Sequence, residues 1–140
     1  MTFLLDTNVV SELRKVTAGR ADPGVAAWAD STPAGSMYIS AITVLELELG
    51  VLAIERRDAP SGAVLRSLLE TRVLPTFARR TLSVDTAVAR KCASLHTPDP
   101  KAERDALIAA TALVHHLTVV TRNVRDFEPT GVDVLDPWTA

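Results

Sequence analysis

The chain of 140 residues predicts an α/β fold built on a mainly parallel sheet of four to five strands. Short apolar or β-branched runs alternate with helical patterns from end to end, and no long linker separates them. Strands that alternate with helices form parallel sheets with both faces covered. The length suits one domain with a sizeable core, so we expect a single domain over residues 1–140.

The first elements are a strand, a short helix, a second helix and a second strand. Phe3–Leu5 is a buried strand that stops at Asp6, and residues 8–14 have a helical pattern. Asp22-Pro23 predicts a helix start, because Asp caps well and Pro fits the first helical position. Met37–Ser40 is the second expected strand.

Two helices are expected to follow, separated by a break. Residues 43–57 form a long apolar pattern, and the run at 59–62 interrupts it. We expect Ser61 to cap the next helix. The expected inner face of that helix consists of Val64, Leu65, Leu68 and Leu69.

The C-terminal half supplies the remaining strands and two helices. Thr81–Val84 is the third expected strand, although Val73-Leu74 competes for that place. A helix follows Asp85, and another spans residues 102–116 after a loop at 97–100. The last two expected strands are residues 118–121 and 132–135.

Composition limits where the protein works. One cysteine, Cys92, cannot form an internal disulfide, which fits a reducing cytoplasm. The N-terminus lacks the basic region of a signal peptide, and the longest uncharged stretch, 106–121, is shorter than a bilayer span. The expectation is a cytoplasmic protein with no membrane partner. The formal charge of -2 by itself speaks against a nucleic-acid partner.

Asp6 and Asp126 each follow an expected strand. Ligands of such folds bind beyond the carboxyl ends of the strands. Asp6 is equally explained as the cap of the next helix, and Asp126 as an ordinary loop residue in 121–127.

Glu46 lies within the apolar helix at 43–57. Thr43 and Glu46 match a capping box, which would turn the carboxylate back to the backbone. Glu48 points about 200° away from it around the helix, toward solvent. Gly50, one turn further, predicts a close approach to a neighbouring helix, which would place Glu46 near the packed side.

Asp105 is the acid that most needs a partner. It shares a helical face with Ile108, Ala109 and Ala112, where an unpaired carboxylate is costly. A helix that starts at Asp99 places it about one turn inside, where the helix dipole offers little. Four acids at one sheet edge repel one another, and divalent cations relieve this. Such a set suits Mg²⁺ and phosphodiester hydrolysis by metal-activated water.

The same segments resemble PIN-domain ribonucleases, most closely the VapC-type toxins of toxin–antitoxin pairs. Four motifs carry the resemblance, and the likeness runs from about residue 2 to residue 138. They are Leu4-Leu5-Asp6-Thr7-Asn8, residues 40–47 with Gly50, residues 105–112, and residues 121–127 with Asn123 and Asp126.

This resemblance implies a three-layer α/β/α sandwich in which Asp6, Glu46, Asp105 and Asp126 are catalytic and bind Mg²⁺, with Mn²⁺ as a substitute. It also implies an RNA substrate, a homodimer and a small VapB-like antitoxin. The antitoxin would block the acidic pocket and carry a DNA-binding segment, so the toxin would meet DNA only through it. The polar supports implied by the resemblance are Thr7, Asn8, Thr121 and Asn123.

Basic residues are the other candidates. Twelve of the 15 Lys and Arg residues are arginine, whose planar fork suits phosphate. We expect Arg14 and Arg122 to contact RNA. Arg104 and Arg125 also lie near the acids in sequence, and we interpret them as solvated or paired with neighbouring acids.

The histidines and Cys92 are not assigned to a site. His115 and His116 lie about 100° apart on a helix and do not chelate one ion, since the chelating spacing is four residues. His96 is isolated, and Cys92 lies on a stripe with core hydrophobic residues.

The leading hypothesis is therefore a Mg²⁺-dependent endoribonuclease that acts as a toxin. The alternative is a catalytically silent PIN-like module that binds RNA or a protein. A phosphatase with a nucleophilic Asp after its first strand fits poorly, because Asn8 stands where a second Asp is required. Without the four acids, 15 basic groups face 13 acidic ones, so the net charge no longer excludes RNA.

Overall fold

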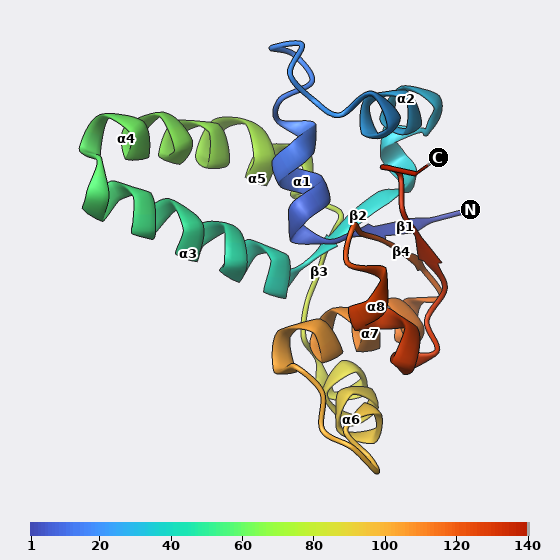
Figure 1. Ribbon diagram of the computed structural model, residues 1–140. Helices are drawn as coiled ribbons and strands as arrows, with labels where there is room; N and C mark the ends of the chain where they lie inside the picture. Colours follow the sequence, from blue (N-terminus) through green and yellow to red (C-terminus); the bar gives the residue numbers. More distant parts are fainter. Residues whose placement is uncertain (140) are drawn as a thin grey trace.

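A five-stranded sheet, parallel throughout, forms the centre of the computed structural model, which describes residues 1–139 (Figure 1). The strand order is β3-β2-β1-β4-β5. The strands are β1 Phe3–Leu5, β2 Met37–Ser40, β3 Thr81–Leu82, β4 Thr118–Val120 and β5 Val134–Leu135. The α/β expectation with a parallel sheet is thereby confirmed.

Helices cover both faces of the sheet, which gives the expected sandwich (Figure 1). They are α1 Thr7–Leu13, α2 Pro23–Ser31, α3 Ala41–Arg57, α4 Ala59–Leu68, α5 Leu74–Thr76, α6 Thr86–Leu95, α7 Glu103–His115 and α8 Val124–Phe127. The remaining helical segments are two short 3₁₀ helices, Ala34–Ser36 and Glu128–Thr130, and a π-helical segment, Leu69–Val73. No described helix is long and apolar enough to cross a membrane.

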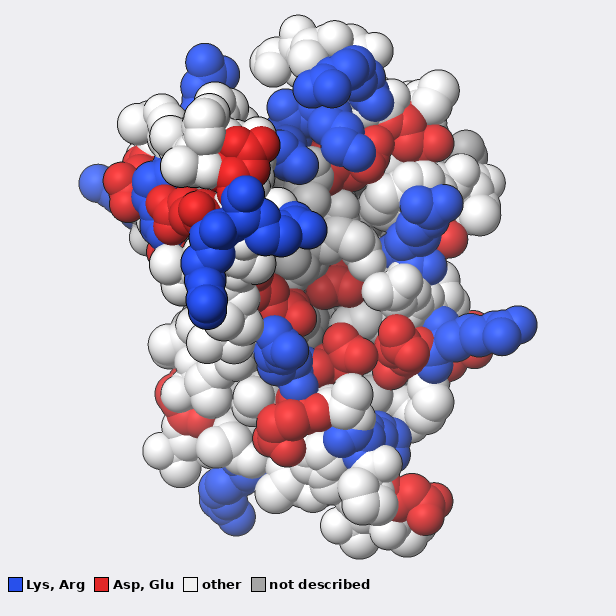
Figure 2. All heavy atoms as spheres, turned by 60° about the vertical axis from the view of Figure 1, so that its left-hand side comes forward, with Lys and Arg blue, Asp and Glu red and all other residues white. Residues whose placement is uncertain are grey.

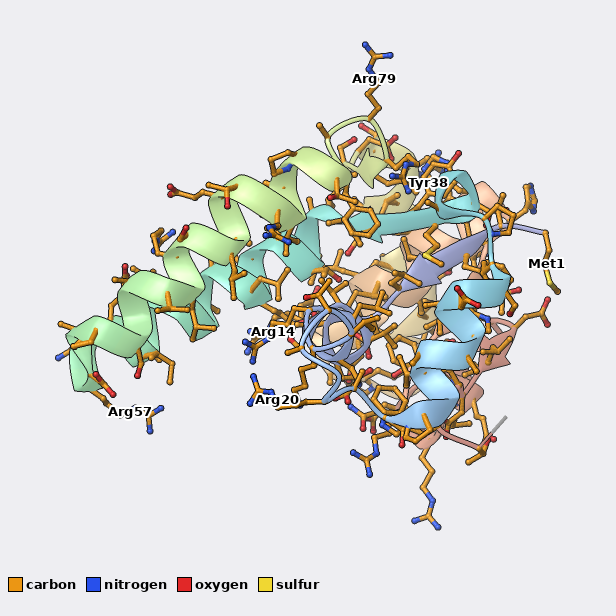
Figure 3. All side chains as sticks on the ribbon, turned by 90° about the horizontal axis from the view of Figure 1, so that it is seen from above. Met1, Arg14, Arg20, Tyr38, Arg57 and Arg79 are labelled. Atoms are coloured by element: carbon orange, nitrogen blue, oxygen red, sulfur yellow. The ribbon has the colours of Figure 1, made fainter. Side chains whose placement is uncertain are left out.

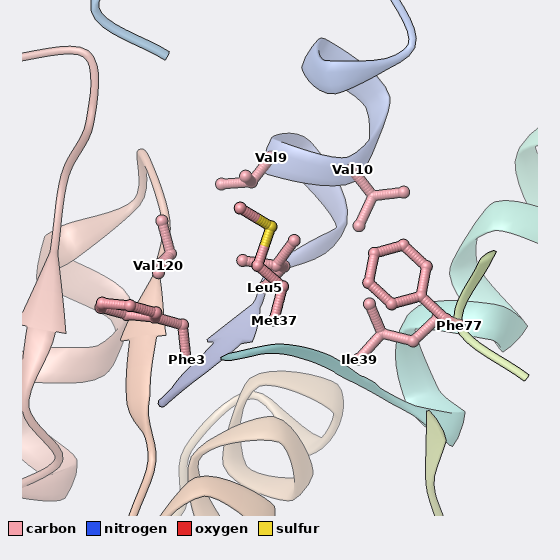
Figure 4. Packing of buried hydrophobic residues seen from close by; sticks show 8 residues of the cluster. All are labelled: Phe3, Leu5, Val9, Val10, Met37, Ile39, Phe77 and Val120. Atoms are coloured by element: carbon pink, nitrogen blue, oxygen red, sulfur yellow. The ribbon is translucent and has the colours of Figure 1, made fainter. Parts of the chain in front are cut away.

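Alternate residues of the strands build two separate cores. On the face covered by α1 and α2, Leu5 and Ile39 pack with Val9 and Phe77 (Figure 4). On the face covered by α7 and α8, Leu4 and Val119 pack with Phe127. This period of two explains why such short strands are fixed in register, since a slip by one residue would exchange the faces.

The helices α3 and α4 form an antiparallel hairpin that extends away from the sheet (Figure 1). They approach closely at Gly62, where an added Cβ would lie 2.5 Å from the Cα of Glu55. Gly50, for which we expected this role, has open space around it. Glu48 is not simply solvated either, because Arg66 donates a 2.8 Å hydrogen bond to it and also bonds Glu55.

Two predictions about helix termini are wrong, those for α4 and α3, whereas α7 matches the expected span of 102–116 and excludes only the alternative start at Asp99. Helix α4 begins earlier than expected, with Asp58 as its cap, because the Asp58 carboxylate accepts hydrogen bonds from the backbone and hydroxyl of Ser61. Helix α7 begins at Glu103, so Asp105 lies in its first turn. Helix α3 is capped by Ser40, whose hydroxyl accepts from the Thr43 backbone at 3.1 Å.

One expectation about α4 fails, and the expected third strand is confirmed over its competitor. Val64 does not lie on the inner face of α4, because its side chain is 61% exposed. Val73-Leu74 forms part of a helical segment, which leaves Thr81–Leu82 as the third strand. Periodicity alone does not separate a short strand from a buried helical turn, and here the strand is the segment that pairs with β2.

Candidate active site

Asp6 lies at the carboxyl edge of the sheet, directly after β1, and its side chain is buried. It both caps α1 and belongs to the site, so the two interpretations of the sequence are compatible. One carboxylate oxygen accepts from the Thr7 backbone at 2.8 Å, and the other accepts from the Thr121 hydroxyl at 2.8 Å. The Asn8 amide lies 3.4 Å from both Asp6 Oδ2 and the Thr121 hydroxyl.

Glu46 faces Asp6 from the first half of α3. Its carboxylate does not close a capping box at Thr43, because the Ser40 hydroxyl caps the helix instead. Glu46 Oε1 accepts a 2.6 Å hydrogen bond from the Thr7 hydroxyl. The Thr7 side chain thus connects the end of β1 to α3 and orients the Glu46 carboxylate.

Asp105 lies at the beginning of α7, half-buried, with no hydrogen-bonded partner among residues 1–139. Burial and the negative charges of Asp6, Asp126 and Glu46 raise its pKa to about 6, and Arg104 opposes this only weakly. The first turn of α7 favours a carboxylate through the helix dipole. The position of Asp105 is therefore electrostatically costly unless a cation is present.

Asp126 belongs to α8, in the loop that follows β4, and it is exposed. Its negative charge contributes to the raised pKa values of Asp6 and Asp105. The Asn123 backbone donates to the Thr121 hydroxyl at 3.0 Å, and the Arg122 backbone donates to Asn8 Oδ1 at 3.3 Å. The bond to Asn8 fixes the start of the loop against the first turn of α1.

The structure thus brings all four predicted acids, with Thr7, Asn8 and Thr121, to one edge of the sheet. Asn123 contributes through its backbone. Acidic side chains gather in the hollowed middle of one face, and Lys and Arg surround them (Figure 2). Burial is also the largest cause of the raised Asp6 pKa. An excess of uncompensated carboxylates with oxygen donors suits a divalent cation of the Mg²⁺ or Mn²⁺ type.

The four carboxylates form an open ring. Within residues 1–139, no three of them bring one oxygen each within 4.8 Å of one another. Magnesium keeps several waters when it binds proteins, so one or two of these carboxylates are enough to bind it directly.

A compact donor group does occur elsewhere, between α6 and α7. Cys92 Sγ lies 3.7 Å from His96 Nε2, which lies 3.3 Å from Glu103 Oε2. The Lys101 backbone donates to His96 Nδ1 at 3.0 Å, so the proton of the neutral ring resides on Nε2 and points toward Glu103. This arrangement ties the loop at 97–102 to α6 and leaves no free ring nitrogen for a metal ion.

A groove of about 550 Å³ opens beside the acids, between α1, α3 and α4. Thr7 and Glu46 line one end of it, and most of its other lining residues are apolar, such as Leu47 and Leu68. Arg14 and Arg57 also line the groove and extend on the same side of the α3–α4 hairpin (Figure 3).

Three arginines that lie near the acids in sequence occupy different environments. Arg122 stacks over Trp138, with its guanidinium carbon 5.3 Å from the ring centroid. Arg14 is exposed and donates to the Ser11 carbonyl. Arg104 was not among the residues we assigned to the site, yet its Nη1 lies 3.7 Å from Glu46 Oε2. Its place next to Asp105 in sequence indicates a position near the acids, but no local signal shows that its side chain reaches Glu46.

The comparisons with known proteins agree with this architecture. The family model of the PIN domain matches residues 3–131. This chain belongs to the PIN-domain family. The VapC ribonuclease Y4jK of Sinorhizobium fredii is 38% identical over 144 residues, which cover 97% of each chain.

Solved structures of other proteins have a similar fold. The crystal structure of FitAcB from Neisseria gonorrhoeae matches with a TM-score of 0.89 and 39% identity, over 99% of this chain and 100% of that one. A toxin–antitoxin complex from Klebsiella pneumoniae matches with a TM-score of 0.64 and 26% identity, over 97% and 98% of the chains. The chain is a PIN-domain protein of the VapC type, as its sequence motifs indicated.

Proposed function

We propose that this PIN-domain protein is a Mg²⁺-dependent endoribonuclease and the toxin of a VapBC-like toxin–antitoxin pair. The observation that carries the proposal is the meeting of four carboxylates at one sheet edge, with the Asp105 pKa raised to about 6 and, among the described residues, Arg104 as the one basic side chain within 4.0 Å of them. The similarity to a VapC ribonuclease over nearly the whole chain supports the reaction class.

The residues of the site have separable tasks in this proposal. The buried Asp6 and the half-buried Asp105 supply the carboxylates that hold the divalent cation, with Glu46 and Asp126 beside them. The Thr121 and Thr7 hydroxyls fix the Asp6 and Glu46 carboxylates in place, so little ordering remains when the cation binds. The bound cation would supply charge stabilisation to the phosphate and lower the pKa of water at the site.

Cleavage of a defined RNA panel tests the proposal. Wild type and Asp6→Asn are compared in Mg²⁺, in Mn²⁺ and in chelator, and circular dichroism shows whether the variant is folded. We expect cleavage by wild type in either metal and none by the variant. Asp133→Asn is a matched control, because this exposed acid precedes β5 at the opposite edge of the sheet.

Folded wild type that cleaves none of the RNAs, and whose melting temperature does not rise with either metal, would favour the silent PIN-like module instead. Cleavage that persists in Asp6→Asn and Asp105→Asn would contradict the assignment of the site.

The groove is our candidate for the antitoxin site. Its apolar lining suits the apolar face of a short helix of a small partner, and it ends at Glu46, so an occupied groove would cover the acids. A similar chain occurs in a toxin–antitoxin complex, which supports such a partner. We place the protein in the cytoplasm, where RNA and a VapB-like antitoxin meet it, with DNA contacted only by the antitoxin.

A homodimer completes the proposal. Leu45, Leu49 and Leu52 lie on one stripe of α3 and are each close to half-exposed. Such a stripe suits a second copy of the same helix. Sedimentation of wild type and Leu49→Glu tests it: we expect a dimer that the charge converts to a monomer, and unchanged sedimentation would contradict this face.

A further inference from the structure

We propose that Arg104 is the residue that contacts an RNA phosphate beside the four carboxylates, leaving Glu46 when cation and RNA are bound. This inference deepens the proposed function and rests on it. It assigns a role in substrate binding to a residue that the sequence motifs left among the solvated arginines.

Position is the first observation. Arg104 lies in the first turn of α7, next to Asp105, and its guanidinium Nη1 is 3.7 Å from Glu46 Oε2. Within residues 1–139, no other Lys, Arg or His nitrogen lies within 4.0 Å of a carboxylate oxygen of the four acids. Arg104 is thus the cationic side chain nearest to where a phosphodiester would meet the site.

Its freedom to move is the second observation. The Arg104 side chain is 51% exposed, and its separation from Glu46 exceeds hydrogen-bonding distance. Exposed ion pairs of this kind are weak and exchange readily. Arg66 differs, because it is only 24% exposed and bonds Glu48 and Glu55 with distances of 2.6 to 3.3 Å. Arg66 is therefore fixed in the hairpin, whereas the Arg104 side chain is free to bind a phosphate.

The charges around the site explain why Arg104 would leave Glu46 for an RNA phosphate. Without a cation, the surplus negative charge around Glu46 attracts Arg104. A bound divalent cation neutralises part of that charge, so the attraction weakens. A phosphate then offers two oxygens that match the planar fork of arginine better than one oxygen at 3.7 Å.

This role predicts two effects of opposite sign for Arg104→Gln. Loss of the positive charge removes a repulsion toward the divalent cation, so Mn²⁺ should bind several-fold more tightly in the absence of RNA. Loss of the phosphate contact should weaken RNA binding by about tenfold. A general disturbance of the fold would weaken both.

The RNA measurement uses a fluorescently labelled, uncleavable single-stranded RNA analogue and the full-length protein with Asp6 intact in saturating Mg²⁺, so that the cation is bound and cleavage does not interfere. Anisotropy is recorded over a salt series with and without Arg104→Gln. We expect weaker binding and a dependence on log salt reduced by about 0.7, the loss of one phosphate contact. Arg104→Lys should retain part of the affinity, and Arg90→Gln, an exposed residue of α6, should retain all of it.

The Mn²⁺ measurement uses calorimetry on proteins with an intact Asp6. In the active enzyme, Arg104→Gln should raise KM more than it lowers kcat. RNA affinity and salt dependence equal to those of the parent protein would overturn the role of Arg104 while leaving the proposed function intact. Failure of the parent protein to bind RNA at all would overturn both.

Discussion

Thr7 and Glu46, which are 39 residues apart in the sequence, are joined by a 2.6 Å hydrogen bond from the threonine hydroxyl to Glu46 Oε1. The Thr7 backbone meanwhile donates to Asp6. One residue therefore holds two of the four carboxylates, each through a different group. The site depends on this threonine even though Thr7 is not itself an acid.

Replacing Thr7 by Val should lower RNA cleavage by about 10- to 100-fold, because residues that orient metal-binding carboxylates have effects of this size. The isopropyl side chain keeps the volume and removes the hydroxyl that positions Glu46. Thr7→Ser keeps the hydroxyl and should retain most of the activity. Initial rates at saturating Mg²⁺ compare the three proteins, and equal rates for Val and Thr would show that Glu46 needs no such support.

Stability should depend on pH through Asp105, whose pKa is raised to about 6 by burial and by the charges of Asp6, Asp126 and Glu46. The folded chain binds the Asp105 proton more tightly than the unfolded chain does. The contribution of this proton to the free energy of unfolding is therefore complete below pH 3.8, and it is lost as the pH rises through 6. In chelator at pH 8, Asp105→Asn should therefore melt at a higher temperature than wild type, and the gap should shrink toward pH 5.

Magnesium should reverse that order at pH 8, since it stabilises the folded wild type and binds the variant less well. Differential scanning fluorimetry at both pH values, with chelator and with Mg²⁺, gives the four comparisons. Asp133→Asn should show neither effect. A wild type that melts above Asp105→Asn in chelator at pH 8 would show that the Asp105 carboxylate is not under electrostatic strain.

Two glycines of the hairpin should respond oppositely to alanine. Gly62→Ala places a methyl group 2.5 Å from the Glu55 backbone, so the helices must separate, at a cost of about 1–3 kcal/mol. Gly50→Ala meets open space within α3 and should stabilise by about 0.5–1 kcal/mol through helix propensity. Urea unfolding measures both, and destabilisation by Gly50→Ala would contradict the open surroundings of that residue.

These glycines also show how far the sequence could predict the hairpin. A glycine in a helix indicates that a neighbouring helix can approach closely there, but the sequence does not show at which of the two glycines, Gly50 or Gly62, the two helices meet. The answer depends on the crossing point of α3 and α4, which is set by Asp58 as cap and by Arg66 bonding across the helices. The Asp58 cap is local, but the Arg66 bonds join residues on two different helices, which a local pattern does not reveal.

The candidate site, like the hairpin, could be predicted from the sequence only in part. Asp6 and Asp126 were expected at the sheet edge because each follows a strand, and the structure places both there. The local pattern at Thr43 favoured a capping box for Glu46, whereas the partner of Glu46 is a hydroxyl 39 residues away. Arg104 was overlooked for a related reason, since sequence proximity to Asp105 does not reveal that its side chain reaches Glu46.

Filling the groove from within should separate partner binding from folding. Gly50 lines the groove and has nothing within 4 Å of an added Cβ, so Gly50→Phe should project its ring into the space we assign to the antitoxin. We expect a folded protein whose affinity for its antitoxin falls at least tenfold, because a helix seated in the groove would meet the ring. Gly35→Phe, which also meets open space but lies outside the groove, is the matched control. Pull-down and calorimetry with the co-expressed antitoxin compare the variants, and undiminished affinity for Gly50→Phe would place the antitoxin on another surface.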